Sequence, residues 1–275
     1  MSPVFHKTCF QLNALRTCLL LGGLLVFAHP AASAQQDAGI KTDRPDFVES
    51  SDVVGSRRFQ VEAGYAVERN EADGRKERLS STPLLLRAGI SDTLELRLET
   101  DGRIISRVDR GVATDNARGY ADMSVGIKWH AQDNDGVKPA LGWLLHADLD
   151  TGSHAFRANG IRPSVRMVAE WELPHELSLG VMPGLMWDKR DDGRRFVSGI
   201  LGVVLGKAWT ERFGTFIELA AQQVAKTKNG GSIVTYDAGF TYLLSNSWQV
   251  DTGISRAAND NTPDYAWTVG VSRKF

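Results

Sequence analysis

The chain has 275 residues, of which 42% are hydrophobic and 24% are charged, and its formal net charge is -1. A mean hydropathy just below zero excludes a bundle of membrane helices. The balanced charge and the large apolar fraction argue against a disordered chain. Without a surplus of basic residues, the composition gives no support to nucleic-acid binding.

The N-terminus has the pattern of a secretion signal. Lys7 and Arg16 precede an apolar run over residues 18–27, which is too short to span a bilayer as a helix. Ala32 and Ala34 follow with the spacing of a cleavage site. We therefore predict that residues 1–34 are a signal peptide that is cleaved after Ala34. Both cysteines of the chain lie in this segment, so the exported protein would contain no disulfide.

From residue 59 onward the sequence alternates with a period of two. The clearest case is residues 94–99, where leucine alternates with Glu or Arg, so that a helix would place charge on every face. The pattern predicts strands with one apolar and one polar face in twelve segments. Their approximate ranges are 59–68, 79–90, 94–99, 123–129, 141–149, 165–171, 177–187, 195–208, 213–219, 236–242, 248–254 and 265–275.

The predicted strands and their connections indicate a membrane barrel. The strands are longer than those of soluble sheets and match a tilted bilayer crossing. Mostly long polar connections, such as 70–78 and 102–118, alternate with mostly short ones, such as 91–93 and 173–176. Aromatic residues gather near both strand ends, as in interfacial belts. A soluble periplasmic sandwich is the competing interpretation, and it fits the strand lengths poorly.

We therefore predict an all-β fold over residues 58–275. It is a closed antiparallel transmembrane β-barrel of about 12 strands, of the type found in the outer membrane of Gram-negative bacteria, with both ends of the barrel chain on the periplasmic side. Closure is required because hydrocarbon offers no hydrogen-bond partner to a free strand edge.

Short motifs throughout the exported chain resemble one protein family. They are TDRPDF at 42–47, QVEAGY at 60–65, GYAD at 119–122, GIK at 126–128, TG at 151–152, GFTYLLS at 239–245 and QVD at 249–251. Together they resemble the outer-membrane transporter family named for the meta-pathway of phenol degradation. The resemblance implies an outer-membrane channel, often encoded among genes for the breakdown of aromatic compounds. The third residue from the end is aromatic in that family but is Arg273 here, and we expect its side chain to reach the periplasmic interface.

The polar face of the predicted strands supplies the candidates for the lumen lining. They are Glu62, Arg87, Glu95, Arg97, Glu99, Asp122, Lys128, His146, Asp148, Asp150, Arg166, Glu170, Glu218, Asp237 and Asp251. Carboxylates outnumber cations in this set, which predicts a wet and somewhat acidic lumen. Two interpretations remain open: a pore with a mild preference for cations, or charges that pair across a small lumen and block it.

Three of these candidates, His146, Asp148 and Asp150, fall on the same face of one predicted strand. Imidazole and carboxylate groups can bind metal ions or transfer protons, but a polar lumen needs such residues at alternate positions anyway. The sequence contains no GxSxG, HExxH or glycine-rich phosphate-binding motif. We therefore predict no catalytic residues, no metal site and no cofactor. An outer-membrane hydrolase or a sealed structural barrel remains the alternative.

Residues 35–57 are polar and do not alternate. Their candidate functional residues are Asp43, Arg44, Asp46 and Glu49. One interpretation is a periplasmic tail. The other is a plug that folds into the lumen and pairs its charges with wall residues such as Arg87 and Arg97.

The predicted function is an outer-membrane channel for the passive uptake of small solutes, with aromatic or hydrophobic compounds implied by the family resemblance alone. The expected partners are outer-membrane lipid, lipopolysaccharide, the barrel assembly machinery and a small-molecule solute, without nucleic acid. We expect the arginine-rich connection 102–118 to be a solvated loop; the alternatives are that it contacts lipopolysaccharide or folds over the barrel mouth.

Overall fold

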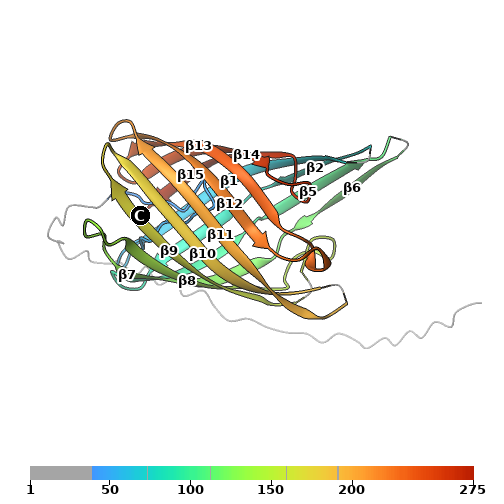
Figure 1. Ribbon diagram of the computed structural model, residues 1–275, viewed down its shortest axis with the longest axis horizontal. Coiled ribbons are helices and arrows are strands. Elements are labelled where there is room, and N and C mark those ends of the chain that lie inside the picture. The colour runs from blue at the N-terminus through green and yellow to red at the C-terminus, as the bar shows by residue number, and fades with distance from the viewer. Residues whose placement is uncertain (1–38, 73, 112, 159, 191) are drawn as a thin grey trace, which may run out of the picture. The chain divides into compact units, whose positions relative to one another are not determined.

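The computed structural model describes residues 39–275 except 73, 112, 159 and 191, and its strands form a single antiparallel sheet (Figure 1). The strands are β1 (Phe59–Ala72), β2 (Arg75–Ser81), β3 (Leu84–Gly89), β4 (Leu94–Thr100), β5 (Arg103–Asp109), β6 (Thr114–Tyr120), β7 (Met123–Gln132), β8 (Ala140–Asp148), β9 (Arg162–Leu173), β10 (Leu177–Lys189), β11 (Arg195–Ala208), β12 (Phe213–Val224), β13 (Ile233–Ser245), β14 (Trp248–Ala257) and β15 (Tyr265–Lys274). A short 3-10 helix, η1 (Thr227–Asn229), lies between β12 and β13. The described residues include no helix that is long and apolar enough to cross a membrane.

These fifteen segments make twelve barrel strands, because three of the strands are interrupted. Only Thr82 and Pro83 separate β2 from β3, and both segments pair with β1. Residues 101–102 separate β4 from β5, and residues 121–122 separate β6 from β7. The interruptions fall in neighbouring strands, since β3, β4 and β7 pair in order, as do β2, β5 and β6. Pro83 contributes to the first interruption because it has no amide hydrogen for a ladder. The predicted count of about twelve strands is confirmed.

The first and last strands close the barrel. β1 pairs with β15 in antiparallel register. At the end of this seam, Phe59 and Phe275 exchange backbone hydrogen bonds of 3.4 and 2.8 Å. The short connections at 91–93 and 246–247 lie at the same end, which we call the short-turn end, and the opposite end is the long-loop end. The predicted closed antiparallel barrel is confirmed.

The apolar face of the alternating strands points outward. Large hydrophobic side chains exposed on it include Leu96, Trp129, Trp143, Leu145, Ile217 and Ile254. Such extensive apolar exposure is unfavourable in water and favourable in hydrocarbon. At the short-turn end, the Arg273 guanidinium carbon lies 4.8 Å from the centre of the Trp248 ring and 4.3 Å from that of Phe275. These contacts hold the unusual Arg273 against two aromatic rings.

Two connections predicted as loops are strands, and this part of the prediction is wrong. β1 continues to Ala72 and β2 begins at Arg75, while β5 and β6 form a hairpin within the predicted loop 102–118. β2, β5 and β6 extend the wall beyond its neighbours at the long-loop end (Figure 1). The high charge of these residues obscured an alternation in which Ile104 and Val108 are buried between exposed arginines.

The predicted signal peptide, residues 1–34, lies outside the described residues, as do residues 35–38 of the polar segment. The cleavage after Ala34 therefore stays a prediction.

Candidate functional site in the barrel lumen

Residues 39–57 lie inside the barrel as a loop that enters and leaves at the short-turn end, and we call them the lumen segment. The Ile40 amide donates a 2.7 Å hydrogen bond to the Asn246 carbonyl in the turn after β13. At the other end, the Arg57 amide donates to the Gly89 carbonyl at 3.1 Å. Between these points Val48 is only 4% exposed.

Asp43 is the centre of a buried cluster of charges. Its carboxylate lies 2.5 Å from Arg97, 2.8 Å from Lys128 and 3.3 Å from Arg87. Burial by itself would raise the pKa of Asp43, but the cations of Arg87, Lys128 and Arg97 outweigh it and hold that pKa well below its ordinary value. Asp43 is therefore the counter-ion of three wall cations from three strands.

The other charged residues of the lumen segment differ in their surroundings. Glu49 pairs with Arg97 at 2.7 Å and with Arg166 at 2.9 Å. Arg44 reaches the opposite wall, where it lies 3.3 Å from the Asp251 carboxylate. Asp46 lines the cavity above the segment. Burial and the neighbouring Glu218 carboxylate raise the pKa of Asp46 well above its ordinary value.

Four wall carboxylates accept hydrogen bonds from backbone amides of the lumen segment. Glu62 accepts from Asp43 (3.0 Å), Glu218 from Phe47 (2.8 Å) and Val48 (2.7 Å), Glu170 from Ser51 (2.6 Å), and Glu95 from Val54 (2.9 Å). These carboxylates come from strands spread around the barrel, so the segment is held from several sides. A chain without secondary structure has free amide groups, and charged acceptors satisfy them well.

One side of the lumen is apolar, which the sequence prediction missed. Val48 packs against Leu144, Val168 and Met182, which project inward from β8, β9 and β10. Gly202 provides the space that Val48 occupies beside this contact. A Cβ added at Gly202 would lie only 2.5 Å from a methyl group of Val48. The signal was available: apolar residues at the polar positions of the alternation in three successive strands.

The Gly202 contact gives a test of the fit. We expect Gly202→Val to displace Val48 and to lower the stability of the folded barrel by about 1–3 kcal/mol, as overpacking usually does. The thermal unfolding midpoint in detergent measures this effect. Gly199→Val on the same strand is the matched control, since an added Cβ there meets only Val224, at 3.4 Å. Equal midpoints for the two variants would contradict a close fit.

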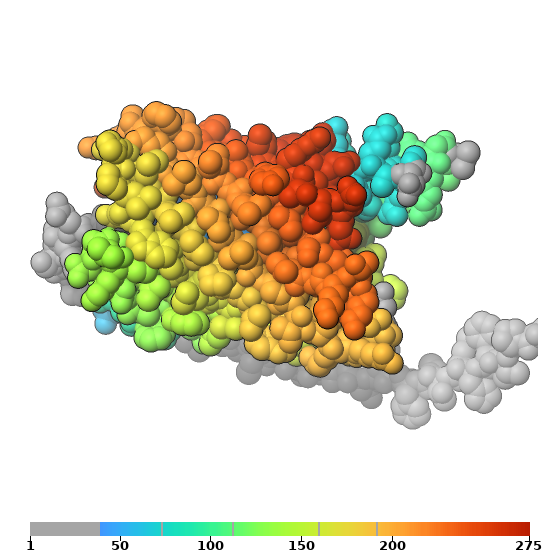
Figure 2. Space-filling model, viewed as in Figure 1, coloured from blue at the N-terminus to red at the C-terminus, as the bar shows by residue number. Residues whose placement is uncertain are grey.

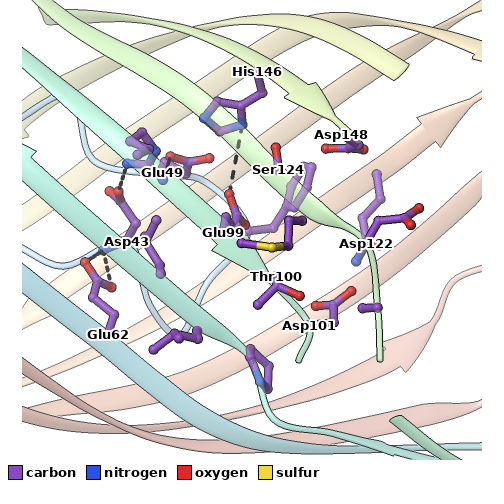
Figure 3. Close-up of a pocket in the computed structure, with 18 of the residues that line it drawn as sticks. Asp43, Glu49, Glu62, Glu99, Thr100, Asp101, Asp122, Ser124, His146 and Asp148 are labelled. Atoms are coloured by element: carbon purple, nitrogen blue, oxygen red, sulfur yellow. Dashed lines mark hydrogen bonds and ion pairs between the residues drawn. The ribbon is translucent and has the colours of Figure 1, made fainter. Parts of the chain in front are cut away.

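A cavity of about 520 Å³ lies on the long-loop side of the lumen segment (Figure 3). Glu99, Asp101, Asp122 and Asp148 line it together with Arg162 and Arg166. Asp148 pairs with Arg162 at 3.2 Å. The cavity wall also includes the apolar residues Ile104, Phe156, Met186 and Ile200. It is thus a mixed polar and apolar chamber whose floor is the lumen segment.

The remaining predicted lining residues have local roles. Asp122 accepts hydrogen bonds from the amides of Thr151, Gly152 and Ala158 and so holds the connection after β8. Asp150 lies beyond the end of β8, where it is 3.7 Å from Arg157.

The other two residues stand on the wall. Asp237 accepts a 3.0 Å hydrogen bond from Thr235. His146 lies on the lumen wall with its Nδ1 atom 4.0 Å from a Glu99 oxygen. The structure therefore separates Asp150 from His146 and brings Glu99 to it. In the part of the chain that the structure describes, no group of three His, Cys, Asp or Glu side chains is arranged to hold a metal ion.

A closed twelve-stranded barrel with an apolar exterior and a charged interior defines the class of outer-membrane β-barrels. The model of one protein family, described as "Putative MetA-pathway of phenol degradation", matches residues 42–275, and the chain belongs to this family. The resemblance found from the short motifs is confirmed. No curated protein matches the chain.

Solved structures share the fold at low sequence identity. An outer membrane channel from Pseudomonas putida F1 has a TM-score of 0.60 and 12% identity, over 86% of this chain and 100% of that one. The translocator domain of the autotransporter NalP from Neisseria meningitidis has a TM-score of 0.52 and 14% identity, over 82% of this chain and 90% of that one. The KdgM porin, in complex with disordered oligogalacturonate, has a TM-score of 0.50 and 11% identity, over 78% of this chain and 99% of that one. The fold is therefore that of outer-membrane barrels.

Proposed function

We propose that the protein is an outer-membrane channel through which small solutes diffuse passively, and that it is not an enzyme. The observation that carries this proposal is the chamber of about 520 Å³ inside a closed barrel. Against a hydrolase, the Ser124 hydroxyl near His146 in the chamber makes no hydrogen bond with a described residue, so no activated nucleophile supports that alternative (Figure 3).

We propose further that the lumen segment acts as a plug that narrows the passage between the chamber and the short-turn end. The ion pairs of Asp43 and Glu49 with the wall support this role. So do the backbone amides held by four wall carboxylates and the seat of Val48 in an apolar pocket. A tail that extended into the periplasm would instead leave these charged groups, backbone amides and the Val48 side chain exposed to water. A barrel sealed permanently by the plug is the second candidate, and the same ion pairs favour it.

The cellular setting and the cargo are part of the proposal. Residues 1–34 would direct export from a Gram-negative cytoplasm, and the barrel assembly machinery would insert the chain with its short-turn end in the periplasm. Outer-membrane lipid and lipopolysaccharide would surround the wall. The family description points to aromatic compounds as the cargo. The carboxylates that face the chamber favour cations over anions of equal size.

Swelling of liposomes that contain the purified mature protein tests the channel. We expect small sugars, amino acids and aromatic acids to enter, with rates that fall steeply with size because twelve strands leave a lumen narrower than that of a sixteen-stranded porin. Among solutes of matched size, cationic amino acids should enter faster than anionic ones. Protein-free liposomes and liposomes with heat-denatured protein are the controls. A complete lack of swelling with every solute would support the sealed barrel instead.

A further inference from the structure

A row of arginines crosses the outer face of the barrel near the long-loop end. In the register of the sheet, Arg256 of β14 lies opposite Tyr265 of β15, and Tyr265 lies opposite Arg69 of β1. Arg69 lies opposite Arg78 of β2, which in turn lies opposite Arg107 of β5. Residues directly opposite in a sheet share a face, so these side chains form one row across five neighbouring strands. We call Arg256, Arg69, Arg78 and Arg107 the arginine row.

The arginine row faces outward. Arg69 lies on the same face of β1 as the exposed Tyr65, whereas Glu62 on the opposite face of the strand is fully buried in the lumen. All four arginines are exposed, and none makes an ion pair with a residue in the described ranges. The Arg69 guanidinium carbon lies 5.6 Å from the centre of the Tyr265 ring. The row thus begins where the aromatic belt of the barrel ends.

This arrangement is unfavourable unless an anion is present. Like charges directly opposite in a sheet repel, and Arg69, Arg78 and Arg107 are three in succession. Two carboxylates on this face, Glu71 and Asp109, lie one row further out, opposite Lys76. Glu71 pairs with Lys76 at 3.1 Å. The arginine row is therefore left without a counter-ion of its own among the described residues.

An apolar groove adjoins the row on the membrane side. Its volume is about 500 Å³, and it lies over β13, β14 and β15. Tyr236, Ile254 and Trp267 form its sides, and Ala238 provides the space between them. Arg256 and Tyr265 belong both to the groove and to the row. Figure 2 shows the red residues of the C-terminal strands beside the cyan and green residues of the extended strands β2, β5 and β6.

We propose that this face is a binding site for one lipopolysaccharide molecule, with its lipid A phosphates on the arginine row and an acyl chain in the groove. The proposal rests on the proposed outer-membrane location and goes beyond it by assigning the ligand and its residues. Guanidinium groups bind phosphate through paired N–H donors, and the planar forks of neighbouring arginines can share one diphosphorylated headgroup. The site combines a row of cations with an adjoining apolar groove. An anionic lipid can contact both parts, whereas a soluble anion can contact only the cations, so the lipid should bind more tightly.

Binding of fluorescent lipopolysaccharide to the purified barrel in neutral detergent tests the site. We expect the triple variant Arg69→Gln, Arg78→Gln, Arg107→Gln to bind roughly a hundredfold more weakly than wild type, since each basic residue near an anionic surface contributes a factor of about five. The control triple Arg157→Gln, Arg190→Gln, Arg194→Gln removes the same charge from connections at the same end and should bind as wild type does. Ala238→Trp fills the groove and should also weaken binding.

Two further measurements separate the possible results. Without lipid, the row variant should unfold at the same temperature as wild type or higher, because repulsion among its cations is gone; this rules out misfolding as the reason for lost binding. Lipid A stripped of both phosphates should bind wild type and the row variant equally. Equal lipopolysaccharide affinity for the row and control variants would overturn the proposal, and so would phosphatidylglycerol that competes as well as lipopolysaccharide. Solute swelling is unaffected by either result, since the row lies outside the lumen.

Discussion

Deletion of residues 39–54 is expected to raise the single-channel conductance of the barrel severalfold. The deleted residues are the part of the lumen segment that Glu62, Glu170, Glu218 and Glu95 hold inside the barrel. Their removal leaves a twelve-stranded lumen with room for a continuous water column. It also removes two cations and four carboxylates, so the lumen should become less selective for cations. Planar bilayer recordings measure both quantities.

The deletion must be distinguished from a damaged barrel. Residues 55–58 are kept because the Arg57 amide donates a hydrogen bond to Gly89 and β1 begins at Phe59. The heat-modifiable migration of folded barrels in gels and the circular dichroism of the sheet serve as controls for folding. Conductance that equals the wild-type value in a folded deletion variant would show that the segment does not limit the passage.

Asp43→Asn is expected to release the lumen segment by a single change. The variant leaves the buried cations Arg87, Arg97 and Lys128 without their shared counter-ion, and breaking a buried ion pair from one side destabilises the bound state by about 3–5 kcal/mol. The conductance should therefore rise toward that of the deletion. Residues 35–275 contain no cysteine, and a cysteine introduced at Val48 in a protein made of these residues should react faster with a water-soluble maleimide in this background.

Asp52→Asn is the matched control for Asp43→Asn. Asp52 lies in the same segment, but its side chain is 42% exposed and its carboxylate lies 4.0 Å from the His130 ring. An exposed pair of this kind contributes little, so the Asp52 variant should conduct as wild type does. If Asp52→Asn and Asp43→Asn had the same small effect, the charge cluster would not be what retains the segment.

The pH dependence of the same contact has a defined direction. The pKa of Asp43 is held well below its ordinary value, so its contribution to stability is present above the pKa of a free aspartate, about 3.9, and is lost only as the pH falls further. Mild acid should therefore not mimic Asp43→Asn. This difference separates loss of the Asp43 charge from protonation of more exposed carboxylates in the lumen.

The twelve strands were predictable because the period of two is a local property of the sequence. At 94–99 leucines alternate with charged residues, and the structure places Leu96 outside and Glu95 and Arg97 inside. The extended hairpin of β5 and β6 was missed because its exposed arginines resemble a solvated loop. Its Ile104 and Val108 have the period of a strand, but the high density of charged residues around them masks this alternation.

The partners of the lumen charges could not be predicted in the same way. The sequence indicates that Arg87, Arg97 and Lys128 face inward, but not that Asp43 lies between all three. That contact joins positions as many as 85 residues apart, and it depends on the register of four neighbouring strands. Inward-facing charges produce the same alternation in the sequence whether the pore is open or blocked. The sequence alone therefore does not distinguish the two.

The sequence by itself determined the strand count, the closed barrel, and the side of the wall on which the alternating polar and apolar residues of the predicted strands lie, because solvent on one face and lipid on the other impose a strict alternation. Only the tertiary structure decided where residues 39–57 lie and which wall groups bind them. It alone also placed Arg69, Arg78 and Arg107 side by side on one outer face. Closure brings distant strands into register, and register, unlike periodicity, is set by the whole sheet.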